Sequence, residues 1–267
     1  MSKTAVAEAT ITSVAPADLM DMFEENAGAG LEKIGSDEMQ IPFLRILQAL
    51  SPQLNKQDSL YIKGAEQGDL FNTVSNRIYK ADEGMVVIPV AFETKYLEFQ
   101  LRSAGGGFVG EKNPNDPDLT RTTREGPAEM LPSGNELVRT HQHLVLVYDE
   151  DTGEYEPAVM DMKKTQLKVS RKWNSQRKSV RAMGKNGMFL LPIYGTAWRV
   201  TTIAESNDQG SWYNFRIDRV EDVSKMGHAM LEAKTMAESF QKGEIKTAAA
   251  SNEEMKQADS LSDEVPF

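Results

Sequence analysis

Short runs rich in Val, Ile, Phe and Tyr, separated by turn residues, constrain the fold of this chain more than any other feature. Because β-branched and aromatic residues favour strands while Gly, Pro, Asn and Asp favour turns, each run predicts a strand. Pro89 interrupts the longest run and predicts either an edge strand or a bulge. A curved β-sheet is therefore expected. The runs lie at 41–47, 68–73, 85–99, 143–148, 155–160, 195–204 and 212–217.

Helical patterns occur mainly in the second half of the chain. Residues 163–183 contain no Pro or Gly and predict a helix that Gly184 and Gly187 can end. A final helix is expected over 223–241. This order predicts an α+β fold that is mainly β: an OB-fold-like antiparallel barrel with an inserted basic helix, a C-terminal helix and a disordered acidic tail. A two-sheet sandwich gives the same pattern of strands.

Composition divides the chain into three parts. Residues 1–35 predict a flexible N-terminal arm, with a short helical pattern at 18–25. Residues 36–243 are expected to form the OB-like domain, in which 103–139 is a long loop insertion because it is rich in Gly and Pro. Residues 244–267 lack large apolar side chains over most of their length and predict a disordered acidic tail.

Charge is segregated along the chain. The net charge is −10, but residues 1–40 sum to −6 and residues 244–267 to −4, so 41–243 are neutral. Within that centre, 161–185 hold nine bases and one acid. Clustered cations of this kind are typical of a phosphate-binding surface. The bases are Lys163, Lys164, Lys168, Arg171, Lys172, Arg177, Lys178, Arg181 and Lys185.

The spacing of these bases indicates a shared helix face. Lys164, Lys168, Arg171 and Lys172 recur at intervals of three and four residues. We expect the stripe to track the phosphates of a single strand, with Trp173 either packing inward or stacking on a base. The alternative is an ordinary solvated helix whose bases pair with carboxylates elsewhere in the protein.

Aromatic residues are interleaved with arginines on the last two predicted strands. Trp198 adjoins Arg199, and Trp212 lies four residues before Arg216. Rings beside cations can stack on exposed bases. The competing interpretation is burial, since most aromatic side chains in a β domain belong to the core. We include these four residues among the expected DNA-binding residues.

Enzyme and metal motifs were sought in the sequence. The absence of Cys excludes disulfides and thiolate chemistry, and the Gly-rich segments lack the spacing of phosphate-binding loops. His141 and His143 share a strand face and are more often structural than metal-ligating. We expect no catalytic residues, no metal and no cofactor. No apolar stretch is long enough to span a membrane.

The last five residues carry the sharpest local motif. Asp263, Glu264, Val265, Pro266 and Phe267 combine carboxylates with a stiff proline and a terminal ring that can enter an apolar pocket of a partner. They resemble the acidic tip of bacterial single-stranded DNA-binding proteins, with Val265 in place of isoleucine and Glu264 in place of aspartate. The alternative is a tail that only increases solubility.

Three segments of the body, 41–44, 51–53 and 167–174, carry a second resemblance. Through them the body is similar to single-stranded DNA-binding proteins of podophage type, which join an OB fold to an acidic tail. This resemblance implies a sequence-nonspecific protein that protects and organises single-stranded DNA in phage replication, recombination and repair, in the cytoplasm of an infected bacterial host. Through its tail it would recruit replication and recombination proteins such as polymerase, helicase/primase or nuclease. A homodimer is left open.

The sequence leaves two other functions open. One is a recombination or annealing mediator, which holds strands for pairing as well as covering them. The other is a metal-dependent nuclease built from scattered Asp and Glu, for which the sequence offers no carboxylate constellation.

Overall fold

The structure is a computed structural model that describes residues 17–26, 29–30, 40–126, 128–208, 210–245 and 247. The chain divides into two units, Met1–Gln40 and Ile41–Phe267. In the first unit α1 (Ala17–Glu25) confirms the short helix expected there. Most of the expected N-terminal arm, and nearly all of the acidic tail with Asp263–Phe267, lies outside the described residues.

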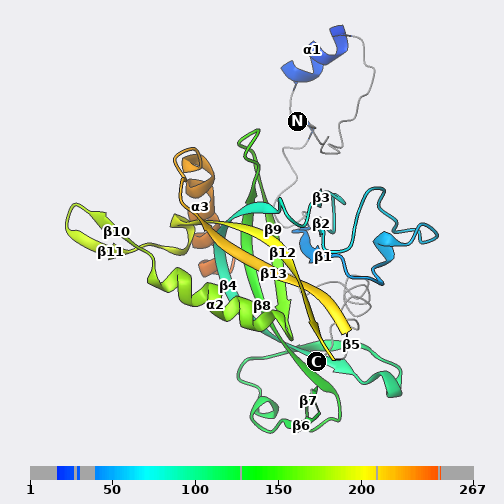
Figure 1. Cartoon of the computed structure of the whole chain (residues 1–267). Coiled ribbons are helices and arrows are strands. Elements are labelled where there is room, and N and C mark those ends of the chain that lie inside the picture. The colour runs from blue at the N-terminus through cyan, green and yellow to red at the C-terminus, as the bar shows by residue number, and fades with distance from the viewer. Residues whose placement is uncertain are drawn as a thin grey trace. The chain divides into compact units, whose positions relative to one another are not determined.

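The body of the protein is the unit Ile41–Phe267, and Figure 1 shows its strands and helices. Its helices are α2 (Gln166–Ser179) and α3 (Gly227–Lys242), with short 3-10 helices at Pro52–Leu54, Arg102–Ala104, Pro117–Thr120 and Ile193–Gly195. Its strands are β1 (Phe43–Ile46), β2 (Leu70–Asn72), β3 (Ile78–Tyr79), β4 (Met85–Gln100), β5 (Gly107–Lys112), β6 (Thr123–Glu125), β7 (Ala128–Met130), β8 (Glu136–Tyr148), β9 (Tyr155–Lys163), β10 (Arg181–Gly184), β11 (Gly187–Leu190), β12 (Ala197–Asn207) and β13 (Gly210–Val220).

A single curled sheet, shaped like half of a barrel, organises the body (Figure 1). Its main path runs β13-β12-β4-β8-β9-β1-β2-β3. Neighbours on this path are antiparallel except β1 and β9, which are parallel. The register of β4 against β8 shifts between Pro89 and Ala91, which confirms the bulge expected at the proline. Bulges bend a strand and increase its twist, and this one lies near the start of β4, where Pro89 pairs with Val145.

Both faces of the central strands are buried, which explains their continuous apolar sequences. Val86 and Ile88 of β4 lie in one core cluster together with residues of α3. Met85 and Val87 lie in a second cluster together with Trp173 of α2. Because successive side chains of a strand point to opposite faces, α3 covers one face of the sheet and α2 covers the other. These central strands therefore need apolar residues at nearly every position, and not only at every second one.

The segment 103–139, expected to be a loop insertion, contains strands instead. β5 pairs with β4, β7 pairs with β8, and β6 pairs with β7, so the segment extends the long β4–β8 pair beyond the body of the sheet. The composition conceals these strands because they are short and largely polar. They are held by polar side-chain contacts as well as by a few apolar side chains such as Phe108 and Met130.

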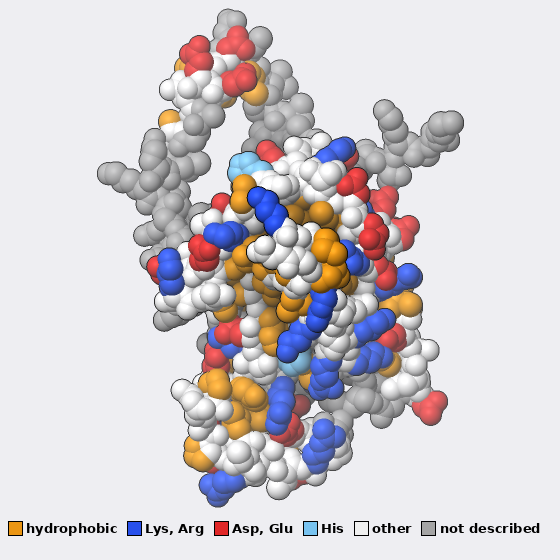
Figure 2. All heavy atoms as spheres, turned by 90° about the vertical axis from the view of Figure 1, so that its left-hand side faces the viewer, with side chains coloured by type: hydrophobic (Ala, Val, Ile, Leu, Met, Phe, Trp, Pro, Cys, Tyr) orange, Lys and Arg blue, Asp and Glu red, His pale blue; other side chains and the backbone are white. Residues whose placement is uncertain are grey.

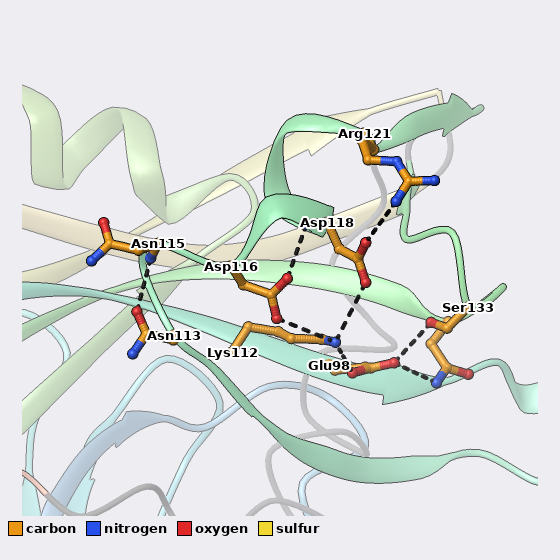
Figure 3. Close-up of polar contacts among 9 residues, drawn as sticks. Glu98, Lys112, Asn113, Asn115, Asp116, Asp118, Arg121 and Ser133 are labelled. Atoms are coloured by element: carbon orange, nitrogen blue, oxygen red, sulfur yellow. Dashed lines mark hydrogen bonds and ion pairs between the residues drawn. The ribbon is translucent and has the colours of Figure 1, made fainter.

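Lys112 at the end of β5 makes many of those contacts (Figure 3). Its Nζ lies 3.2 Å from Glu98, 3.6 Å from Asp116 and 4.0 Å from Asp118. Asn135 also donates a hydrogen bond to Glu98 at 2.7 Å. Burial alone raises the pKa of Glu98, but the hydrogen bonds from its neighbours outweigh burial and lower the pKa. This ionised carboxylate therefore joins β4 to both flanking segments.

The mixed α+β class, the strands of the sheet and the C-terminal helix expected from the sequence are confirmed. Gly243, with φ of 76°, ends α3 in the left-handed conformation that favours glycine. No helix among the described residues is long and apolar enough to cross a membrane.

Candidate nucleic-acid interface

Helix α2 carries most of the cations singled out in the sequence. It follows β9 through Lys164, whose φ of 50° gives the chain a sharp change of direction. Its buried positions are Ser170, Trp173 and Arg177, spaced three and four residues apart. These positions form one face, which packs against β8, β9 and β13. The opposite face points to solvent.

Ser170 anchors the helix to β8. Its Oγ lies 2.7 Å from Nδ1 of His141 and 2.8 Å from Nε2 of His143. Burial, reinforced by the charge of Arg177 and by His141, holds the pKa of His143 well below its usual value, so this ring is neutral. Burial and the charge of Arg171 also lower the pKa of His141. The two histidines thus both contact Ser170 and hold α2 against β8.

The direction of the hydrogen bonds in this cluster follows from Arg177, which can only donate. A guanidinium nitrogen of Arg177 lies 3.2 Å from Nδ1 of His143, so Nδ1 of His143 accepts this hydrogen bond. The neutral ring then carries its proton on Nε2 and donates to Ser170, whose hydroxyl is free to donate to His141. A directed chain of hydrogen bonds therefore links α2 to β8.

Arg177 itself was expected to contact phosphates, and the structure corrects that assignment. Its guanidinium lies over the ring of Trp173, 4.3 Å from the ring centre, and donates to Asn174. The side chain is buried, and burial lowers its pKa to about 10. Arg177 therefore remains a cation at neutral pH but faces inward, where it cannot reach a polyanion.

The solvent face of α2 presents Lys168, Arg171, Lys172 and Lys178, all exposed. Lys168 pairs with Glu205 of β12 at 2.8 Å. Within the described part of the chain, Arg171, Lys172 and Lys178 make no ion pair. Since repulsion among close cations is relieved by an anion, this face is suited to bind one.

The predicted helix ends earlier than its sequence suggests. Val180 leaves the helix with an extended backbone, and the chain then forms the hairpin β10–β11. Gly184 pairs with Gly187, so Lys185 lies in the turn between them. Arg181 and Lys185 are exposed, but they lie on the hairpin and not on the helix. Gly184 and Gly187 are close enough in sequence to form a hairpin turn, whereas the sequence pattern was interpreted only as the end of a helix.

Two grooves run beside α2. One, of about 550 Å³, is lined by Lys168, Lys172 and Arg216 together with apolar groups of Ile203 and Phe215. It lies between α2 and the β12–β13 pair. Cations next to apolar groups fit a strand that presents phosphates and unstacked bases together.

The second groove, of about 750 Å³, lies between the start of α2 and the β7–β8 arm. It is lined by Lys164, Arg171, Arg124 and Arg139 among others. Arg139 is paired with Glu129 at 2.9 Å, whereas Arg124 makes no ion pair among the described residues. Sequence reasoning missed both arginines because they lie far from the basic stripe in the chain.

The expected stacking role of the tryptophans also needs correction. Trp173, Trp198 and Trp212 are all buried and belong to the core beneath α2 and the last strands. The indole nitrogen of Trp198 donates to Thr196 at 2.9 Å, and that of Trp212 donates to Glu205 at 3.2 Å. None of the three rings has a face open to a base.

The arginines expected beside these rings lie at the surface but are paired. Arg199 contacts Glu150 at 2.6 Å, and Arg216 contacts Asp218 at 2.8 Å. Lys163 is partly buried, with its Nζ 6.0 Å from the centre of the Phe99 ring. Of these three cations, Arg216 lines the groove between α2 and the β12–β13 pair, whereas Arg199 and Lys163 line neither groove beside α2.

The structure brings the remaining cations to one side of the body. Figure 2 faces the side from which β10–β11 projects in Figure 1, and blue Lys and Arg side chains gather around orange apolar ones in the middle of this view. We call the exposed cations of α2 and the hairpin the basic face: Lys168, Arg171, Lys172, Lys178, Arg181 and Lys185. Among the described residues no group of three His, Asp or Glu is arranged to hold a metal ion.

Comparison with known proteins gives one match. A family model described as Pam3 phage gp34-like protein matches residues 7–246. No curated protein and no solved structure matches the chain. The family model spans the sheet, α2, the hairpin and all of α3. The chain is therefore a phage protein that belongs to the Pam3 phage gp34-like family.

Proposed function

We propose that the protein binds single-stranded DNA without sequence preference, through the basic face and the grooves beside it. The observation that carries this proposal is the set of exposed cations with no ion pair in the described part of the chain: Arg171, Lys172, Lys178, Arg181 and Lys185. No Asp or Glu occurs between Asp161 and Glu205 in the sequence. Although the protein is acidic overall, this surface therefore presents cations and few carboxylates that would repel phosphates.

A single strand fits this surface better than a duplex. Contacts with phosphates alone would suit either form, but the groove between α2 and β12–β13 also offers an apolar group, the side chain of Ile203, which is 46% exposed. Only unstacked bases can use such groups. The curled, mostly antiparallel sheet, with a helix inserted before its last strand pair, supports an OB-type relationship, and we include that relationship in the proposal.

Salt dependence tests the proposal directly. Binding of fluorescent oligo-dT by the full chain should weaken as salt increases, because each neutralised phosphate releases counterions. For roughly five contacts, the slope of log K against log salt should be about −3 to −4. Absence of binding at low salt, both for the full chain and for a chain lacking 252–267, would refute the proposal.

The acidic tail has a separate part in the proposed function. Residues 263–267 would recruit replication and recombination proteins, and the tail would compete with DNA for the basic face when no strand is bound. Removing 252–267 should tighten DNA binding and abolish capture of those proteins from phage-infected cells. Unchanged capture by the truncated chain would rule out recruitment through the tail. Mixing complementary strands with the full chain tests annealing, the second function considered from the sequence.

A further inference from the structure

The hairpin β10–β11 exposes apolar side chains outside the main sheet. Its two strands form a sheet of their own (Figure 1). Met183 is 73% exposed, Met188 62%, Leu190 52% and Phe189 46%. A two-stranded hairpin has almost no core and is marginal in water by itself. Contiguous exposed apolar groups of this kind indicate a surface that is covered in use.

The register of the hairpin separates its apolar groups onto two faces. Met183 pairs directly with Met188, and Arg181 pairs with Leu190. Directly paired residues of antiparallel strands share a face, and alternate residues share it too. One face therefore carries three flexible apolar side chains with a cation at its base.

The other face carries an aromatic ring on a flat base. Phe189 pairs with Ala182, and Gly184 and Gly187 follow on the same face. A Cβ at Gly184 would lie 3.0 Å from Cε1 of Phe189, so the ring lies close against the backbone of this glycine. A ring supported on one side and about half exposed can accept a second flat group by stacking.

Charge identifies the kind of partner. The hairpin and the segments on both sides of it contain no Asp or Glu, whereas Lys178, Arg181 and Lys185 lie within or beside it. A symmetric contact between two copies through this hairpin would bring the same cations together, with no carboxylate between them. An anionic partner with flat apolar groups avoids that repulsion. The hairpin also directly continues α2, whose cations face the same side.

We propose that the hairpin β10–β11 is the base-contacting element of the single-strand site. Phe189 stacks on one base, Met183 and Met188 on the opposite face of the hairpin pack against another nucleotide of the same strand, and Arg181 and Lys185 contact phosphates. The hairpin thus takes the base-stacking role that the sequence suggested for the tryptophans, which are buried and cannot stack on a base. This inference rests on the proposed function, and the test below separates the two.

The test compares oligo-dT binding by the full chain and by hairpin variants. Phe189→Ala should weaken binding about 10-fold or more, because one stacking contact is lost. The salt slope should stay unchanged, because no phosphate contact is removed. Met183→Ser combined with Met188→Ser should weaken binding in the same way. Phe189→Tyr keeps the ring and should bind as the original chain does.

Two controls make the result specific. Leu231→Ala removes an equally exposed apolar side chain from α3 and should leave binding unchanged. Phe189→Trp places an indole on the hairpin, and its fluorescence should be quenched by oligo-dT beyond the change seen in the original chain, whose three indoles are buried. Circular dichroism and thermal melting show whether each variant remains folded.

The outcomes separate the inference from the proposed function. If neither the original chain nor the chain lacking 252–267 binds oligo-dT at low salt, both are wrong. If the original chain binds, and folded Phe189→Ala and Met183→Ser/Met188→Ser variants bind equally well, the hairpin inference is overturned while the proposed function stands. If these variants instead convert a dimer into a monomer without affecting DNA affinity, the hairpin is a contact between copies and the inference is again overturned.

Discussion

Two helices cover opposite faces of the same sheet, and they are attached in different ways. Helix α3 packs through Ala229, Ala233 and Ala237, which recur every four residues and are almost completely buried. Helix α2 packs through Ser170, Trp173 and Arg177, which combine a hydroxyl, an indole and a guanidinium. Small apolar groups require only close approach, whereas buried polar groups require partners.

The attachment of α2 is incomplete in a way that the attachment of α3 is not. Nε1 of Trp173 and one guanidinium nitrogen of Arg177 are buried without a hydrogen-bond partner among the described residues. Each unpartnered buried group is unfavourable by about 1–3 kcal/mol. Beneath its exposed cations, α2 thus carries buried polar groups without partners, whereas the buried residues of α3 are alanines.

The largest effect should come from removing the indole that holds α2. Trp173 lies 4.7 Å from His143 and 6.1 Å from Trp198, measured between ring centres. Trp173→Ala should lower the free energy of unfolding by about 3–5 kcal/mol, because it leaves a cavity and uncovers Arg177. Urea denaturation measures the loss. Trp173→Phe, which keeps a ring, should lose less, and a loss below about 1 kcal/mol for Trp173→Ala would contradict the proposed anchoring.

A smaller effect is expected on the other side of the sheet. Ala233 of α3 is fully buried, so Ala233→Leu inserts extra volume where the helix lies close to β4. Overpacking of this kind should lower the free energy of unfolding by about 1–3 kcal/mol. Leu231→Ala, on the exposed side of α3, should change it by less than about 0.5 kcal/mol. Equal effects of the two variants would show that α3 is not closely packed.

Protonation should distinguish the helices as well, because only α2 has histidines beneath it. His143 has a depressed pKa in the folded protein, whereas the unfolded chain takes up a proton near pH 6.5. The unfolded state therefore binds more protons below that pH, and stability falls as the pH decreases from about 6.5 toward the folded pKa. The fall is up to about 1.4 kcal/mol per pH unit.

Thermal melting of the full chain at about pH 7.5 and about pH 5.5, on either side of the usual histidine pKa, measures this effect. His143→Gln keeps a polar side chain but cannot titrate, so its melting temperature should change less between the two conditions. His141, whose pKa is also lowered, acts in the same direction and leaves a residual effect. An identical change in the variant and the original chain would exclude His143 as the cause.

The sequence predicts the sheet well because the strands are dense in β-branched and aromatic residues and are bounded by turns. It predicts either an edge strand or a bulge at Pro89, because proline cannot donate to the ladder, and the structure has the bulge. It does not predict which face of a strand is covered by a helix, since the alternation of side chains along a strand shows only which residues share a face. For this reason Trp198 and Trp212, placed beside arginines in the sequence, are core residues in the structure.

The site itself was only partly predictable. The cations of α2 follow from their spacing, but the inward position of Arg177 depends on the ring of Trp173 beneath it, a contact that spacing alone does not specify. The hairpin was missed because residues between Lys163 and Met183 contain no Pro or Gly. Without a helix-breaking residue, the sequence does not show where the helix ends and the next strand begins. Tertiary contacts set that boundary, and α2 ends at Ser179.

The smallest effect on stability should come from the outer face of α2, where the effect on binding should be clear. Arg171→Gln and Lys172→Gln remove exposed charges without touching the core, so each should change the free energy of unfolding by less than about 0.5 kcal/mol. If each contacts a phosphate, each should make the salt slope of oligo-dT binding less negative by about 0.7. Lys234→Gln on α3, whose lysine pairs with Glu238 at 2.6 Å, is the matched control and should leave the slope unchanged. Should all three variants reduce the slope equally, the protein would attract DNA by its charge as a whole, and the contrast between a structural helix and a binding helix would fail.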